Sequence, residues 1–126
     1  MDKNIVYQNV ELKNFNSWKV GGKAEHLLIC NDKNILSSYI KSRKIKPPLT
    51  FLGLGSNLLI RDGGIKGTVV VMHGGLSQIN KDKELIYAEA GVSCSKLAKF
   101  SAKKEKIDSA FFAGIPGTVG GALAMN

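Results

Sequence analysis

A short glycine loop constrains the fold of this chain more than any other feature. Gly53-Leu54-Gly55-Ser56-Asn57 follows a run of strand-forming residues and precedes a second extended run at 58–60. A dinucleotide-binding Rossmann unit would begin a helix directly after such a loop and would carry a third glycine where this chain has Leu58. No Gly-Lys-Ser or Gly-Lys-Thr triplet occurs, so the pattern excludes a P-loop as well.

The composition of this loop is compatible with two roles. Glycines on either side of one residue allow successive backbone N–H groups to converge into a concave nest that binds an anion. Ser56 and Asn57 add side-chain donors, so a diphosphate would suit the loop. The alternative is a tight turn that only links two strands. The loop by itself favours neither role.

A second glycine-rich segment lies near the end of the sequence. It reads Gly114-Ile115-Pro116-Gly117-Thr118-Val119-Gly120-Gly121 and is flanked by apolar residues, unlike a flexible linker. Apolar flanks predict that this backbone is packed inside the protein, where glycine permits positive φ or the close approach of a ligand. A flat ring could lie against it. The alternative is a buried, tight connection between a helix and a strand.

Hydrophobic periodicity predicts a chain of mixed strands and helices. Strands are expected at 26–30, 50–54 and 68–71, with a hairpin formed by 76–80 and 85–89. A first helix should begin at Asn31 or Asp32 and run to residue 46, where two prolines stop it. A second helix should begin at Ser93 or Ser95 and run toward residue 107.

Length and composition indicate one modest domain. The chain has 126 residues, 44% of them hydrophobic, which is enough for a packed core. Its apolar runs are far shorter than the roughly 20 residues of a membrane span, and its polar first residues do not resemble a signal peptide. We therefore expect a cytoplasmic protein with no membrane partner. Cys30 and Cys94 lack metal-ligand spacing, so they are expected to be buried free thiols, and no metal site is predicted.

The net charge of +8 would suit an anionic partner. Much of the excess falls on lysines at 96–106 that alternate with apolar residues at helical spacing, as on an ordinary solvated helix face. No zinc-finger spacing, helix-turn-helix signature or RNA-binding aromatic pair is present, so no nucleic-acid partner is expected. A stand-alone module that binds flavin, a nucleotide or nucleic acid is the alternative to the enzyme fragment described below.

Three segments, taken in order, resemble the UDP-N-acetylenolpyruvoylglucosamine reductase family. They are Asn16-Ser17-Trp18-Lys19-Val20-Gly21-Gly22-Lys23-Ala24, Leu52-Gly53-Leu54-Gly55-Ser56-Asn57-Leu58-Leu59 and Ala113-Gly114-Ile115-Pro116-Gly117-Thr118-Val119-Gly120-Gly121-Ala122. The resemblance extends over nearly all of the chain from Phe15 onward. The third segment is the most distinctive of the three.

The resemblance implies an α+β fold with a two-lobed FAD-binding domain of the vanillyl-alcohol oxidase (PCMH) type, incomplete at its C-terminal end. It implies noncovalent FAD, because neither His26 nor His73 occupies the loop position at which relatives attach flavin. The first loop would then bind the FAD diphosphate, and the second segment would line the flavin and its ribityl chain. The implied cofactor-binding residues are Gly53, Leu54, Gly55, Ser56, Asn57, Leu58, Ile115, Gly117, Thr118, Gly120 and Gly121.

The resemblance also implies a reaction and a domain plan. In the family, NADPH reduces FAD, and the reduced flavin passes hydride to the enolpyruvyl group of a UDP-sugar to give UDP-N-acetylmuramate, a peptidoglycan precursor. The expected organisation is an N-terminal extension at 1–15, a first FAD-binding lobe at 16–73 and a truncated second lobe at 74–126. The substrate domain and the catalytic residues would lie beyond Asn126, so no catalytic residue is assigned. The chain alone should be inactive and should self-associate through uncovered surface.

Overall fold

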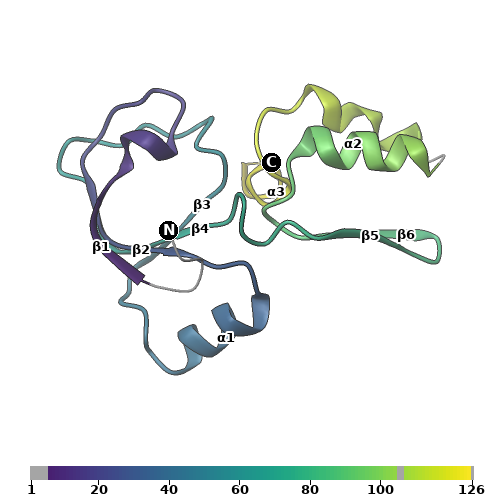
Figure 1. Ribbon diagram of the computed structural model, residues 1–126. Coiled ribbons are helices and arrows are strands. Elements are labelled where there is room, and N and C mark those ends of the chain that lie inside the picture. The colour runs from purple at the N-terminus through teal and green to yellow at the C-terminus, as the bar shows by residue number, and fades with distance from the viewer. Residues whose placement is uncertain (1–5, 105–106, 126) are drawn as a thin grey trace.

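The computed structural model describes residues 6–104 and 107–125, and their helices and strands form two groups (Figure 1). The N-terminal group contains a four-stranded sheet, and the C-terminal group contains a two-stranded hairpin and most of the helical residues. The elements of the N-terminal group are β1 (Val6–Glu11), η1 (Leu12–Phe15, a 3-10 helix), β2 (Lys23–Ile29), α1 (Lys33–Lys41), β3 (Leu49–Leu52) and β4 (Ile65–Val71). Those of the C-terminal group are β5 (Ile79–Asp82), β6 (Leu85–Ala88), α2 (Cys94–Lys103), η2 (Ile107–Gly114, a 3-10 helix) and α3 (Val119–Met125).

The sheet of the N-terminal group has the order β1-β2-β4-β3. β4 is parallel to β2 on one side and to β3 on the other, and β1 is antiparallel to β2. The last five residues of β4, Gly67 through Val71, are buried. A parallel strand covered on both faces requires a continuous run of β-branched residues, which this sequence supplies at 68–71.

Side chains alternate along these strands to build a core on each face of the sheet. Leu27 and Val69 face one side, where they pack with Leu12 of η1. Leu28 and Val70 face the other side, where they pack with Leu36 of α1. The sheet is therefore a central layer, with α1 on one face and the segments around η1 and residue 60 on the other (Figure 1).

Both predicted helix starts are confirmed, but both helices end early. The carboxylate of Asp32 accepts hydrogen bonds from the backbone at the start of α1, and the hydroxyl of Ser93 does so for α2. α1 ends at Lys41, five residues before the predicted limit, because Arg43 adopts a left-handed φ of 54° that terminates the helix before the prolines are reached. α2 ends at Lys103, and residues 105–106 of its predicted extension lie outside the described residues.

The remaining strand predictions differ from the structure mainly at their ends. The hairpin is confirmed, with strands at β5 and β6 that begin or end up to three residues from the predicted limits. Residues 58–60 form no strand, because the chain there packs over the sheet instead of joining it. β1 and α3 were not foreseen from the sequence. Cys30 and Cys94 are buried free thiols, as predicted.

No helix in residues 6–104 or 107–125 has the length and apolar character to cross a bilayer. The longest of the helices that were searched, α2, has 10 residues. A membrane span needs roughly twice that number.

We predict that the Leu27→Ala substitution lowers the free energy of unfolding by about 2–5 kcal/mol. Leu27 is fully buried in the core between β2 and η1, so its truncation leaves a cavity that the sheet cannot close. Urea unfolding followed by circular dichroism measures the change. Leu85→Ala is the matched control: that side chain is 73% exposed, and its loss should change stability by less than about 0.5 kcal/mol. Equal effects of the two substitutions would contradict the assigned core.

Candidate functional site

The two glycine segments identified in the sequence lie against each other. A Cβ atom placed on Gly53 would be 2.5 Å from the Oγ1 atom of Thr118, and one placed on Gly117 would be 3.3 Å from the Oγ atom of Ser56. Gly53 and Ser56 belong to the N-terminal group, whereas Gly117 and Thr118 belong to the C-terminal group. The structure thus brings four of the predicted residues together at the junction of the groups, where α3 lies closest to the sheet (Figure 1).

The first loop is held by the segment that connects β1 to β2. Gly55 has a φ of +69°, and a Cβ atom there would lie 2.1 Å from the carbonyl oxygen of Phe15. The backbone N–H of Ser17 donates to the carbonyl of Gly55 at 3.0 Å. Only glycine fits this position, because both the backbone conformation and the available space exclude a side chain.

The backbone donors of the first loop are not used by the surrounding protein. Among the described residues, none accepts a hydrogen bond from the N–H groups of residues 54–57. The Ser56 side chain is half-buried, and that of Asn57 is exposed. A run of free N–H groups at a turn is suited to an anion, which is one of the two roles that the sequence left open for this loop.

The first of the three sequence segments, at 16–24, packs alongside this loop. The side-chain amide of buried Asn16 donates to the carbonyls of Leu12 and Val20, at 2.8 Å and 2.9 Å. Farther along, the N–H of Gly22 donates to the carbonyl of Arg61 at 3.0 Å. Residues 16–22 therefore run alongside residues 55–61 and fix the position of the first loop.

The N–H groups at the start of α3 already have partners. Those of Val119 and Gly120 donate to the carbonyls of Val92 and Ala90 at 2.8 Å and 2.9 Å, and that of Gly121 donates to the Oγ1 of Thr118 at 3.3 Å. These groups are therefore not free to bind an anion. What the second segment offers is a close fit to the first loop: Thr118 lies directly against Gly53, and Gly117 has a φ of +124°, which favours glycine.

The prediction that the second segment is packed inside the protein is wrong for most of its residues. Of residues 114–121 only Thr118 is buried, and the others are half-buried or exposed. The reason is that the segment packs against the described residues mainly through Gly117, Thr118 and the first residues of α3. Leu123 and Met125, farther along this helix, are 69% and 70% exposed.

A hollow of about 380 Å³ opens beside the first loop. It lies at the carboxyl ends of the parallel strands, the edge at which open α/β sheets bind ligands. Sequence reasoning placed only Gly53 and Leu54 here and missed the rest of the lining. The other lining residues are Asn14, Phe15, Asn16, Ser17, Ile29, Val71 and His73. The rule that parallel strands end at one edge could have found Ile29 and Val71.

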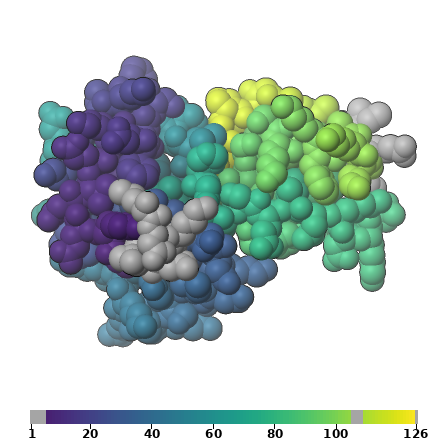
Figure 2. All heavy atoms as spheres, viewed as in Figure 1, coloured from purple at the N-terminus to yellow at the C-terminus, as the bar shows by residue number. Residues whose placement is uncertain are grey.

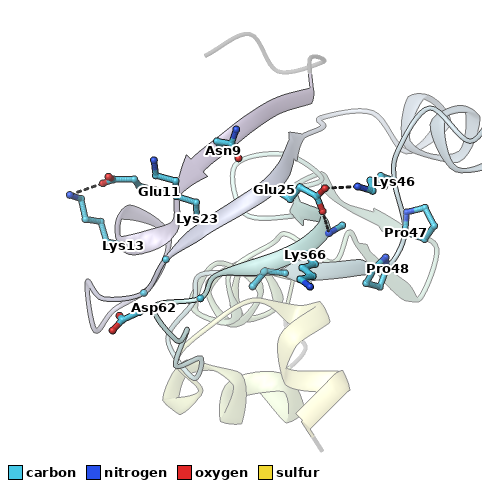
Figure 3. A pocket seen from close by; sticks show the side chains of 15 residues that line it. Asn9, Glu11, Lys13, Lys23, Glu25, Lys46, Pro47, Pro48, Asp62 and Lys66 are labelled. Atoms are coloured by element: carbon cyan, nitrogen blue, oxygen red, sulfur yellow. Dashed lines mark hydrogen bonds and ion pairs between the residues drawn. The ribbon is translucent and has the colours of Figure 1, made fainter.

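A larger hollow, of about 930 Å³, lies at the opposite, amino-terminal edge of the same strands (Figure 3). Its charges are mixed. Lys46 donates to one carboxylate oxygen of Glu25, and the N–H of Gly67 donates to the other at 2.8 Å. Lys13 and Glu11 form a second pair at 2.6 Å. This hollow therefore presents carboxylates as well as lysines, whereas the first loop presents free N–H donors and no carboxylate.

We predict that the Glu25→Gln substitution removes a pH-dependent part of the protein's stability. The hydrogen bond from Lys46, followed by that from Gly67, lowers the pKa of Glu25 below its ordinary value of 4.5. A lowered carboxyl pKa stabilises the fold above the ordinary value, and that contribution is lost as the pH falls through the folded-state pKa. Urea unfolding of both proteins between about pH 7 and pH 3 should show a difference that shrinks toward acid. A difference independent of pH would contradict this pairing.

Comparison with protein families identifies the chain's relatives. The family model described as FAD binding domain matches residues 27–126, which include both glycine segments.

In the described residues no cluster of three or more histidine, cysteine, aspartate or glutamate side chains could hold a metal ion.

Several curated proteins are similar to the chain. UDP-N-acetylenolpyruvoylglucosamine reductase of Nitrosococcus oceani is 49% identical over 119 residues, which cover 94% of this chain and 40% of that protein. The proteins of the same name from Nitrosospira multiformis and Coxiella burnetii are 46% and 47% identical; each match covers 91% of this chain, and 34% and 43% of the respective relatives. The chain therefore spans less than half the length of these relatives.

Proposed function

Because this chain belongs to the FAD binding domain family, we propose that its two glycine segments bind FAD where they meet. The observation that carries this proposal is their contact across the junction, through Gly53 with Thr118 and Gly117 with Ser56. The matched region begins at residue 27 and includes both sides of this contact. A cofactor that bridges the junction would touch both groups.

The free donors decide which part of FAD each segment binds. The unused N–H groups of residues 54–57, with the side chains of Ser56 and Asn57, would bind the diphosphate. Leu54 contributes one of these N–H groups, and Leu58 follows them. The flavin and its ribityl chain would lie along residues 115–121, where a diphosphate would find no free donor at the start of α3. The lining residues there are Ile115, Gly117, Thr118, Gly120 and Gly121.

These residues would bind and orient FAD without reacting. Bound FAD supplies hydride transfer, and the protein sets its position and surroundings. Gly53 and Gly117 allow the two segments to approach each other closely, and Thr118, 2% exposed, fills the space between them. The binding would be noncovalent, since neither His26 nor His73 occupies the loop position at which relatives attach flavin.

We propose that the chain is the FAD-binding part of a UDP-N-acetylenolpyruvoylglucosamine reductase. The names of relatives 46–49% identical to it support this proposal. Such an enzyme would take hydride from NADPH and convert the UDP-linked enolpyruvyl sugar to UDP-N-acetylmuramate. Residues 16–73 would form the first lobe of the FAD domain, residues 74–126 would begin the second, and the substrate-binding residues would lie in the region of the relatives that this chain does not match.

Exposed apolar side chains of the C-terminal group support the proposal that residues 74–126 form only part of the second lobe. Phe111 is 64% exposed, and Leu123 and Met125 of α3 are 69% and 70% exposed. Large apolar side chains gathered on short helices usually pack against further protein. We propose that they are covered by the additional sequence of such a reductase, and that the 126 residues alone self-associate through them.

We predict that the chain binds FAD and that Ser56→Ala weakens this binding about tenfold, the effect of losing one hydrogen bond to a charged group. Titration of FAD fluorescence against the protein measures both affinities. Ser38→Ala is the matched control, because Ser38 is an exposed serine on α1 and should leave the affinity unchanged. Equal affinity in all three proteins would exclude Ser56 as a diphosphate ligand. No binding by the unsubstituted chain would contradict its proposed FAD site.

We also predict that the 126 residues do not oxidise NADPH in the presence of the UDP-linked enolpyruvyl sugar. No acid or base of the described residues lies among those proposed to line the flavin, so nothing there can protonate the substrate. The loss of NADPH absorbance measures turnover, and a full-length relative serves as the positive control. Turnover by the chain alone would overturn the proposed division between cofactor and substrate parts.

A further inference from the structure

A short series of polar contacts connects the two groups at a second place. Lys33, the first residue of α1, donates a hydrogen bond to the hydroxyl of Tyr87 on β6 at 3.0 Å. That hydroxyl donates to a carboxylate oxygen of Glu89 at 3.5 Å. The Lys33 ammonium also lies 5.0 Å from the centre of the Tyr87 ring. We call these three residues the strut.

Both ends of the strut are anchored. Glu89 is 8% exposed, and its second carboxylate oxygen accepts from the backbone N–H of Gln78 at 2.8 Å, which fixes it at the base of the hairpin. Lys33 follows Asp32, whose carboxylate caps α1. The hydrogen bond from Lys33 to Tyr87 is the main cause that raises the pKa of Lys33. The ammonium is therefore charged at neutral pH and can bridge the groups.

A single stretch of chain joins the two groups, so noncovalent contacts such as the strut help to set their relative orientation. The chain crosses once, through residues 72–76, and there Leu76 inserts into the core beneath α1. A Cβ atom on Gly75 would lie 2.3 Å from the carbonyl oxygen of Cys30. Figure 2 shows the two groups meeting along a waist, the N-terminal atoms in purple to teal and the C-terminal atoms in green to yellow.

The strut and the glycine contact lie on different sides of the link. In Figure 1 the amino-terminal end of α1 approaches the hairpin from below, whereas α3 meets the sheet above it. A rotation that opened the strut would therefore change the separation of the two glycine segments. Contacts on both sides hold one orientation more firmly than contacts on one side.

We propose that Lys33 and Tyr87 are positioning residues that set the orientation of the C-terminal group and so hold the two glycine segments at the separation the cofactor requires. The cofactor part of this statement rests on the proposed function. The orientation part rests only on the contacts described above. FAD affinity would then follow the fraction of molecules in the closed orientation.

Distance measurements between two spin labels test the orientation directly. One label is attached through Lys41→Cys on α1 and the other through Lys99→Cys on α2; both positions are exposed, whereas Cys30 and Cys94 are buried. Lys33→Met removes the charge and the hydrogen bond while keeping an unbranched side chain. It should broaden the distance distribution measured by double electron–electron resonance. An unchanged distribution in Lys33→Met would overturn the proposal, whether or not the chain binds FAD.

Two further variants separate positioning from packing. Tyr87→Phe keeps the ring and removes only the hydroxyl, so it should broaden the distribution as Lys33→Met does. Lys33→Arg keeps a cationic donor over the ring and should restore the distribution of the unsubstituted protein. Broadening by Lys33→Arg equal to that by Lys33→Met would contradict the assigned role of the hydrogen bond.

Lys44→Met is the matched control. Lys44 is also an exposed lysine, and its ammonium lies 5.6 Å from the ring centre of Tyr39, within the N-terminal group. Its removal should leave the distance distribution unchanged. A broadening here as large as that from Lys33→Met would show a general effect of lost charge and would refute the strut.

FAD titration of the same variants tests the link to the cofactor. Lys33→Met and Tyr87→Phe should each weaken FAD binding about threefold, the size of effect expected from one partly exposed polar contact, with Lys33→Arg and Lys44→Met unchanged. Broadened distances with unchanged FAD affinity would overturn the cofactor part. Broadened distances in a chain that binds no FAD would support the strut and refute the proposed FAD site.

Discussion

A Cβ atom on residue 53 would lie 2.5 Å from the Oγ1 atom of Thr118, so glycine at this position lets the two groups of elements meet. A side chain is excluded at the nearby Gly55 as well, because its φ is +69° and the carbonyl of Phe15 occupies the space where a Cβ atom would lie. The turn at 53–57 is thus packed against protein on two sides. Its N–H groups are left as its free hydrogen-bonding surface. Close packing and free donors occur together because both follow from the lack of side chains.

The sequence predicts those parts of the fold whose cause is local. The buried strand β4 follows from its β-branched residues, and the starts of α1 and α2 follow from Asp32 and Ser93 as caps. The end of α1 was predicted from Pro47 and Pro48, but the helix stops earlier at the left-handed Arg43. β1 is paired at the edge of the sheet with a strand some 17 residues later in the sequence, and such pairing leaves a weak local signal. Local chemistry thus fixes where elements start more reliably than where they end.

In the candidate site, too, the sequence predicted the local features but not the tertiary contacts. Physical reasoning singled out both glycine segments, and the family resemblance assigned the diphosphate to the first, but neither could show that the two segments touch. That contact depends on the tertiary placement of Thr118, which is 2% exposed, among mostly exposed neighbours. The lining residues Asn14 and His73 were missed for a related reason, since they reach the hollow through the sheet's topology. Only the resemblance to a known family indicated that the two segments bind the same cofactor.

The hydrogen bonds at the start of α3 explain why the two segments cannot exchange the roles proposed for them. A helix N-terminus normally offers free N–H groups to an anion, and a glycine-rich sequence ahead of it strengthens that expectation. Here Val119 and Gly120 donate to carbonyls at residues 92 and 90, which binds α3 to the segment between β6 and α2. The donors that could have bound phosphate instead hold the C-terminal group together. The free donors that could bind an anion at this junction therefore lie on the N-terminal group, whereas Lys33 and Tyr87 add a second contact between the two groups.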